Sequence, residues 1–184
     1  IDVSPLGGAE NVTIENCVNI TDVSALVGVS NVTLNYLPNV YDFSPLGGAE
    51  NVTIINCVNI TDVSAFAGVS NVTLRSLPNI TDVSYLAGVK NLTIGDCKGI
   101  TDLSGLGGIL YLTLHYLPNV TDFSPLAGIR NVTLCNLINI TDISYLAEAE
   151  DVKIRECRNI TDVRPLARVE NVTLHYCRMI TDVI

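Results

Sequence analysis

The sequence repeats every twenty residues, and no insertion or deletion interrupts the repeat over 184 residues. Residues that share a place in successive units form a column, and the clearest column is apolar throughout: Val12, Val32, Val52, Val72, Leu92, Leu112, Val132, Val152 and Val172. Self-similarity at a period of about twenty to fifty residues is typical of a solenoid, in which each unit buries its apolar side against its neighbours. The repeat therefore predicts one continuous stack of nine coils without a linker.

Each unit contains one short strand pattern. Val12 and Ile14 are separated by polar Thr13, which is the period-two alternation of a strand rich in β-branched residues. The apolar positions that follow recur every third residue: Cys17, Ile20, Val23, Leu26 and Val29. This spacing fits a tight polygonal coil with its apolar corners turned inward. Twenty residues leave no room for a long α-helix on the return path.

The return path carries a second local signal. Ser24 belongs to a column that is serine in eight of nine units, and proline occupies the next position in four units, as at Pro45 and Pro125. A serine N-cap with proline at the first helical position predicts a helical turn, here a short 3-10 turn. Glycines such as Gly28 and Gly48 then predict the turn back toward the next strand.

The column that begins at Cys17 alternates between cysteine and leucine along most of the chain: Cys17, Leu37, Cys57, Leu77, Cys97, Leu117, Leu137, Cys157 and Cys177. Cysteines two coils apart are separated by about 10 Å, which exceeds the Cα separation that a disulfide tolerates. We therefore expect buried free thiols, and only the neighbouring pair Cys157 and Cys177 leaves a bridge open. No Cys-x-x-Cys pair indicates a zinc site.

These positions resemble the leucine-rich-repeat family, whose core pattern is L-x-x-L-x-L-x-x-N/C. Val29, Val32, Leu34 and Leu37 occupy the places of that pattern. The segment 17–22, Cys-Val-Asn-Ile-Thr-Asp, is similar to the cysteine-containing class of these repeats. The segment 121–127, Thr-Asp-Phe-Ser-Pro-Leu-Ala, is similar to the repeats of bacterial internalins.

The resemblance covers all 184 residues and implies the fold class. We expect an α/β solenoid: a right-handed leucine-rich-repeat coil of about nine units, with one parallel β-sheet and short 3-10 or irregular convex segments. Neither end shows the polar cap that shields the end of a solenoid. We therefore expect residues 1–184 to form a single solenoid that is a fragment of a longer repeat array.

Charge and chemistry exclude several classes of function. A net charge of −9 with only ten basic residues argues against nucleic acid as a partner. No apolar run approaches the roughly eighteen residues of a membrane helix, so we expect no membrane insertion. His115 and His175 lie three coils apart, and neither has a sequence-evident nucleophile or orienting group. We expect no enzyme activity and no cofactor.

An aspartate column is complete along the chain: Asp2, Asp22, Asp42, Asp62, Asp82, Asp102, Asp122, Asp142, Asp162 and Asp182. One hypothesis is a calcium ladder. The alternative is that each carboxylate accepts backbone N–H groups at the turn that begins the convex segment. Calcium needs about six to eight oxygen ligands, and one aspartate with one threonine per coil falls short. We therefore favour the turn and expect no metal.

The outward face of the strands is polar and repetitive. We predict a binding face on its asparagine and threonine columns, at Asn31, Thr33, Asn51, Thr53, Asn71, Thr73, Asn91, Thr93, Asn131 and Thr133. The alternative is that asparagine and threonine only satisfy each other in hydrogen-bonded ladders. The next column outward varies from unit to unit: Glu15, Asn35, Ile55, Arg75, Gly95, His115, Cys135, Arg155 and His175.

Asn-x-Thr is also the acceptor pattern for N-glycosylation. Glycans are wider than the spacing of about 4.8 Å between strands, so the turn before the Ile-Thr-Asp segment is the better-placed column. Candidate acceptors there are Asn19, Asn59, Asn79, Asn119, Asn139 and Asn159. The alternative is that the repeat template spells the motif without any modification.

Together these patterns predict a non-catalytic structural or adhesive scaffold that is secreted or at the cell surface. Its expected partners are proteins or copies of itself, with glycans as a further class. The alternative is a binder of a repetitive surface such as ice or polysaccharide, through the asparagine and threonine columns.

Overall fold

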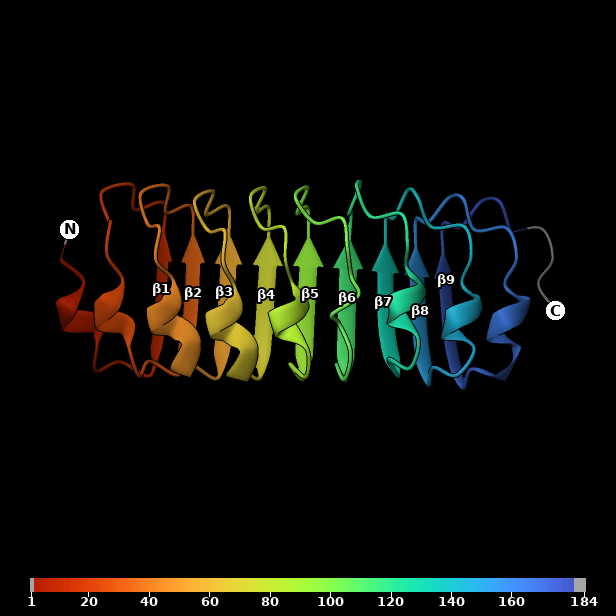
Figure 1. Cartoon of the computed structure of the whole chain (residues 1–184), viewed down its shortest axis with the longest axis horizontal. Coiled ribbons are helices and arrows are strands. Elements are labelled where there is room, and N and C mark those ends of the chain that lie inside the picture. Colours follow the sequence, from red (N-terminus) through yellow and green to blue (C-terminus); the bar gives the residue numbers. More distant parts are fainter. Residues whose placement is uncertain (1, 181–184) are drawn as a thin grey trace.

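The computed structural model describes residues 2–180 as a stack of coils, each with one strand and one return segment (Figure 1). Nine strands form one parallel sheet in chain order. They are β1 Asn11–Glu15, β2 Asn31–Asn35, β3 Asn51–Ile55, β4 Asn71–Arg75, β5 Asn91–Gly95, β6 Tyr111–His115, β7 Asn131–Cys135, β8 Asp151–Arg155 and β9 Asn171–His175. Each residue pairs with the residue twenty positions later, as Val12 does with Val32. The solenoid predicted from the period is confirmed.

The return segments lie opposite the sheet and contain short 3-10 helices (Figure 1). These are η1 Ser4–Leu6, η2 Ser24–Leu26, η3 Ser44–Gly48, η4 Ser64–Gly68, η5 Ser84–Leu86, η6 Ser124–Leu126, η7 Ser144–Leu146 and η8 Arg164–Arg168. No α-helix occurs within residues 2–180, because a twenty-residue coil leaves only a few residues for this segment.

One return segment departs from the others. The segment between β5 and β6 carries no 3-10 helix, and Gly105 stands where the neighbouring coils have Tyr85 and Pro125. A Cβ atom at Gly105 would lie 2.3 Å from the Cα atom of Ser84. The backbones approach so closely here that only glycine fits.

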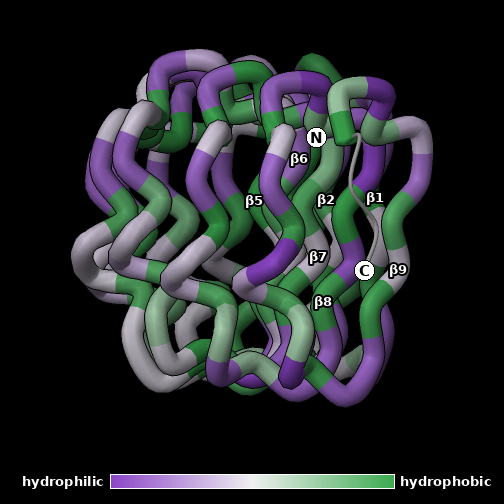
Figure 2. Tube along the Cα trace, turned by 90° about the vertical axis from the view of Figure 1, so that its right-hand side faces the viewer, coloured by the Kyte–Doolittle hydropathy of each residue, from purple (hydrophilic) through white to green (hydrophobic). Residues whose placement is uncertain are grey.

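The core is a single hydrophobic cluster that runs along the inside of the stack. The positions predicted to point inward are buried in nearly every coil, and Phe66, Leu34 and Leu74 have no exposed surface. Among the described residues no polar or charged side chain is classed as buried. Seen after a 90° turn, hydrophobic and hydrophilic stretches alternate around each coil (Figure 2).

The capping of the return segments differs from the prediction. The serine does not act as N-cap: the 3-10 helix η2 begins at Ser24 itself, and the preceding Val23 has no side chain able to cap it. The backbone N–H of Ser24 instead donates to Oδ1 of Asp22 at 2.7 Å. The sequence predicted a serine N-cap because serine is a common N-cap residue. In the structure the side chain of the aspartate two positions earlier accepts the free backbone N–H instead.

A column of left-handed residues follows the strands and was missed from the sequence. Nine non-glycine residues have φ between 42° and 57°: Asn16, Tyr36, Asn56, Ser76, Asp96, Tyr116, Asn136, Glu156 and Tyr176. The backbone N–H of Asn16 donates to the carbonyl of Asn35 in the next coil at 2.9 Å, and the pattern recurs. Asparagine and aspartate tolerate this conformation better than other non-glycine residues. Their presence in four of nine units was the available signal.

Candidate binding surface

An asparagine ladder runs along the outward face of β1–β5. The Nδ2 atom of each asparagine donates to Oδ1 of the asparagine one coil earlier, in the series Asn11, Asn31, Asn51, Asn71 and Asn91. The first bond, from Asn31 to Asn11, measures 2.7 Å, and that from Asn71 to Asn51 measures 2.5 Å. The ladder fixes five amides at the spacing of the strands.

The ladder stops at β6, where Tyr111 replaces the asparagine. Beyond it, Nδ2 of Asn131 donates to the carbonyl oxygen of Leu110 at 2.9 Å. Asp151 occupies the next place in the column, and its Oδ2 accepts a 2.7 Å bond from Nζ of Lys153. Oδ1 of Asp151 is buried without a hydrogen-bond partner. The outward face of β6–β8 therefore lacks the order of β1–β5.

The threonine column stands in register on adjacent strands, with Thr13 beside Thr33 and Thr33 beside Thr53. From Thr33 to Thr133 the members are half-buried, and Lys153 interrupts the column at β8. Within residues 2–180 no side-chain hydrogen bond involves these threonines. The hydrogen-bonded alternative thus describes the asparagines of β1–β5 and not the threonines, whose hydroxyl groups remain available to a ligand.

The variable column contains one cluster that the sequence interpretation missed. Nδ1 of His115 lies 3.2 Å from Oδ2 of Asp96, an orienting group that is not evident in the sequence. Gly95 lies between Arg75 and His115 in the sheet, and a Cβ atom there would come within 3.4 Å of both side chains. Asp96 is nineteen residues from His115, so only the coil geometry brings them together.

No nucleophile completes this cluster. Cys135 is the strand neighbour of His115, but no hydrogen bond joins the two side chains in the described part of the chain. Partial burial raises the pKa of the Cys135 thiol, and the nearby carboxylate of Glu156 acts in the same direction. A thiol with a raised pKa carries little thiolate at neutral pH and is a poor nucleophile.

Five of the six candidate glycosylation sites, all but Asn19, have their amides turned toward the preceding coil. Nδ2 of Asn79 donates to the carbonyl oxygen of Val58 at 2.7 Å, and Asn119 and Asn159 bond equivalent carbonyls at 2.7 and 2.6 Å. Asn59 and Asn139 make the same contact. Nδ2 is also the atom that would carry a glycan, so modification must share or replace this bond.

The aspartate column caps the return segments. In nine coils the carboxylate accepts the backbone N–H two residues later, at 2.7–2.9 Å, from Ser4, Ser24, Ser44, Ser64, Ser84, Ser104, Ser124, Ser144 and Arg164. The hydrogen bonds from Ser44 lower the pKa of Asp42, and those from Arg164 lower the pKa of Asp162 to about 2. Asp182 lies outside the described residues.

The aspartate column does not bring a set of metal ligands together within the described residues. Across residues 2–180 no three His, Cys, Asp or Glu side chains converge as a metal site requires.

The cysteines are free thiols, of which Cys57, Cys97 and Cys157 are buried. Burial raises the pKa of Cys157 to about 11. No disulfide joins Cys157 to Cys177, so the bridge left open by the sequence is not formed.

Comparison with known proteins identifies the repeat type. No protein-family model matches the chain, and no curated protein matches it. Among solved structures, the chain is similar to an internalin, inlF, from Listeria monocytogenes, with 29% identity and a TM-score of 0.62. The match covers 85% of this chain and 50% of that one, so this chain spans about half the length of inlF.

Two further internalins of Listeria monocytogenes are similar in fold. Internalin C2 has 27% identity and a TM-score of 0.46 over 84% of this chain and 66% of its own. The functional domain of InlJ, described as including a cysteine ladder, has 13% identity and a TM-score of 0.44 over 95% of this chain and 51% of its own.

The nine-strand sheet, the 3-10 turns and the twenty-residue period define a leucine-rich-repeat solenoid. The three solved structures described above are internalins, and the repeats of this chain are similar to those of inlF. No helix in the described residues is long and apolar enough to cross a membrane.

Proposed function

We propose that the chain is a non-catalytic scaffold that binds protein partners with the outward face of its sheet, within a secreted or cell-surface protein. The observation that carries this proposal is the contrast between the two faces of that sheet. Inward residues such as Val52 and Ile54 are buried, whereas the outward Asn51 and Thr53 are only half-buried. A rigid core thus holds a broad polar face in fixed register.

The similarity to internalins supports this proposal, and the chemistry of the face does not support catalysis. Among residues 2–180 no nucleophile is hydrogen-bonded to the pair formed by His115 and Asp96. Protein interfaces need instead a set of outward side chains that differ from unit to unit. The variable column and the replacements at Tyr111, Asp151 and Lys153 supply such differences.

A second candidate function is binding of a repetitive surface, either polysaccharide, ice or another copy of the chain. The specific observation in its favour is the ladder of five asparagines beside threonines whose hydroxyl groups make no side-chain bond. Such a ligand would contact β1–β5, where the face is uniform. Glycans attached at the turn asparagines are a separate proposal, which intact mass before and after glycosidase treatment tests.

Affinity capture tests the first proposal. The full chain is immobilised, exposed to a surface-protein extract, and compared with the variant Thr93→Arg/Thr113→Arg on the strand face. A matched control, Thr81→Arg/Thr101→Arg, places the same charges on exposed residues that precede the return segments. We expect the strand-face variant to lose captured proteins and the control to keep them. Equal capture by both variants would contradict the proposal.

The second candidate has its own measurements. Thermal hysteresis and a glycan array both report binding to a regular surface, and light scattering reports self-association. If the asparagine and threonine columns of β1–β5 form the binding site, Thr53→Arg abolishes binding. Tyr111→Asn extends the regular face and should preserve it.

A further inference from the structure

Coil residues Leu110 and Tyr111 break two columns at once. The column of Leu110 holds only polar residues elsewhere: Glu10, Ser30, Glu50, Ser70, Lys90, Arg130, Glu150 and Glu170. The column of Tyr111 holds asparagine in seven units and aspartate in one. Both side chains are exposed, Leu110 by 44% and Tyr111 by 52%. Leu110 and Tyr111 are therefore exposed at positions where the other coils have polar residues.

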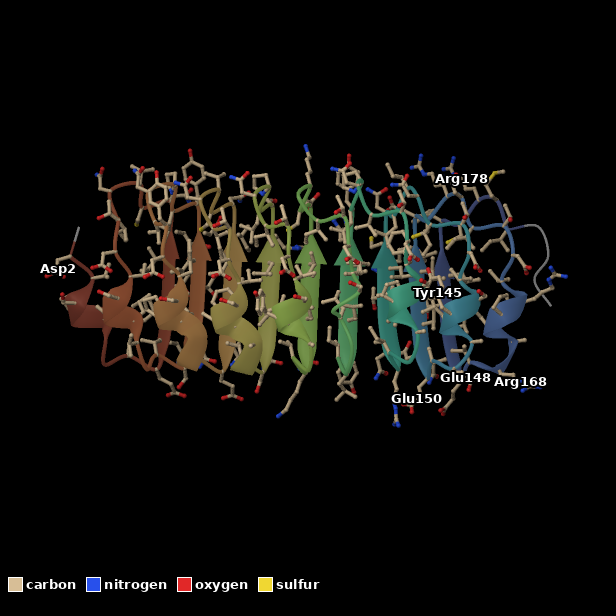
Figure 3. All side chains as sticks on the ribbon, in the orientation of Figure 1. Asp2, Tyr145, Glu148, Glu150, Arg168 and Arg178 are labelled. Atoms are coloured by element: carbon tan, nitrogen blue, oxygen red, sulfur yellow. The ribbon has the colours of Figure 1, made fainter. Side chains whose placement is uncertain are left out.

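Positive charge flanks this pair on both sides. Lys90 and Arg130 hold the equivalent place in the two neighbouring coils, and the carbonyl of Lys90 accepts the backbone N–H groups of Leu110 and Tyr111 at 3.1 and 2.9 Å. The column of Leu110 lies along the edge from which the strands start, where Figure 3 labels its member Glu150. All acidic members of this column lie outside the span from Lys90 to Arg130.

The two cations are accessible to a partner. Lys90 forms no ion pair within the described residues. Arg130 pairs with Glu150 at 3.1 Å, but the two side chains are 67% and 53% exposed. An ion pair so exposed contributes little stability and exchanges readily. A partner carboxylate can therefore compete for Arg130.

A hollow of about 100 Å³ lies on the sheet face beside the tyrosine. Its lining includes Tyr111, Asn131, Thr133, Asp151 and Lys153. All three residues that depart from the asparagine and threonine template border this one hollow. Tyrosine and arginine are the residues most enriched in the energetic centres of protein interfaces, because they combine apolar area with polar groups.

We propose that Leu110 and Tyr111, with Lys90 and Arg130, form the recognition centre of the strand face, and that its partner is an extended acidic segment of a protein. The segment presents apolar side chains between two acidic residues. This inference rests on the proposed protein-binding function and names the partner chemistry of that face.

The spacing sets the form of the segment. Lys90 and Arg130 are two coils apart, about 10 Å at the usual strand separation. An extended chain in the polyproline II conformation advances about 3.1 Å per residue with three residues per turn, so acidic residues three positions apart span about the same distance and lie on one side of the chain. The two residues between them then lie beside Leu110 and Tyr111. The peptide Gly-Glu-Leu-Phe-Glu-Gly satisfies this geometry.

Fluorescence anisotropy with this dye-labelled peptide and the full chain tests the proposal. The variant Leu110→Ser/Tyr111→Asn restores the template of the other coils, so it keeps the fold and removes the centre. We expect it, and Lys90→Glu, to weaken binding at least about tenfold, a difference of about 1.4 kcal/mol. The variant Thr53→Arg/Thr73→Arg, called the lattice variant, changes threonines of β3 and β4 away from the centre and should bind as the wild type does. Melting curves by circular dichroism verify that every variant is folded.

Control peptides with Lys-Leu-Phe-Lys and Glu-Ser-Ser-Glu centres should bind at least about tenfold more weakly. Unchanged binding by the restored variant, or equal binding of the lysine peptide, overturns the proposal. If only the lattice variant loses binding, the strand face remains the binding surface but the centre is misplaced. If no variant changes the affinity, the peptide does not use the strand face at all. Absence of binding to the wild type overturns the acidic partner alone, because the capture assay tests the face independently.

Discussion

β1–β5 and β6–β9 share one core but present different outward faces. In the first region five asparagines bond to one another, and the first basic residue of the chain, Arg75, appears only at the end of β4. In the second region Tyr111 ends the ladder, and Asp151 and Lys153 replace template residues. Repetition of inward residues is required for stacking, whereas repetition of outward residues is not. The region that abandons the outward template is therefore the better candidate for specific recognition.

The largest expected effect concerns what the two regions share. Leu34 in β2 and Leu134 in β7 are both fully buried. Replacing either with alanine leaves a cavity and should lower the free energy of unfolding by about 2–5 kcal/mol. Urea denaturation measures both variants. A loss below about 1 kcal/mol in only one region would show that the core is not equivalent along the stack.

The junction of the two regions gives the next effect. Gly105→Ala places a methyl group against the backbone of Ser84 and should cost about 1–3 kcal/mol. Gly107→Ala is the matched control, because a Cβ atom there meets nothing within 4 Å. Thermal denaturation compares the two. Equal melting temperatures would contradict the close approach of the coils at Gly105.

The ladder of the first region should be measurable by itself. Asn51→Ala removes one bond to Asn31 and one from Asn71, each worth about 0.5–1.5 kcal/mol. Asn131→Ala in the second region removes only the bond to the carbonyl of Leu110 and should cost less. Chemical denaturation of both variants checks the order. A larger loss for Asn131→Ala would mean that the ladder contributes no stability.

Acid should affect the cap at Asp162, in the second region, differently from the caps that rest on serine. Hydrogen bonds lower the folded-state pKa of Asp42 and Asp82, and Arg164 lowers that of Asp162 to about 2, all from an ordinary value of 3.8. A lowered folded-state pKa means that the stabilisation is present above pH 3.8 and is lost as pH falls through the folded-state pKa. Melting temperature should therefore fall below about pH 4.

Asp162→Asn provides the comparison between regions. Because the cap at Asp162 persists to about pH 2, this variant should be less stable than the wild type at pH 3, with a smaller difference at pH 2. Asp42→Asn should lose its difference at a higher pH. Coincident acid transitions of the two variants would contradict the role of Arg164.

The smallest expected effect is a gain. Tyr111→Asn offers an amide to Asn91 and Asn131 and should raise the free energy of unfolding by on the order of 0.5 kcal/mol. It also removes the aromatic ring from the proposed recognition centre. A more stable protein that binds less is the expected combination. A marked loss of stability would show that Tyr111 serves the fold.

The sequence was sufficient for the fold because each inward position recurs nine times. One strand per coil, the register of twenty and the apolar corners all follow from that period. The serine N-cap was wrong, whereas the favoured interpretation of the aspartate column, a carboxylate that accepts the backbone N–H of this turn, is confirmed at Asp22. Ser24 and Asp22 are both good capping residues, and only the backbone path decides between them. The left-handed column was missed because its side chains vary, as at Asn16 and Tyr36, while the conformation is shared.

The outward face was harder to predict. The asparagine and threonine columns are plain in the sequence, but which of them bond to each other depends on side-chain distances. The proximity of His115 to Asp96 arises from a turn at the end of β5 and has no local motif. The break at Leu110 and Tyr111 is visible in the sequence, yet its meaning depends on exposure and on the hollow beside it.

Panning a random peptide library on the full chain shows whether recognition depends on the residues that depart from the repeat. Selected peptides are sequenced and retested on Leu110→Ser/Tyr111→Asn and on Thr53→Arg/Thr73→Arg. We expect peptides with acidic residues about three positions apart around apolar ones, which the first variant no longer binds and the second still binds. Peptides that the first variant retains and the second loses would contradict this expectation.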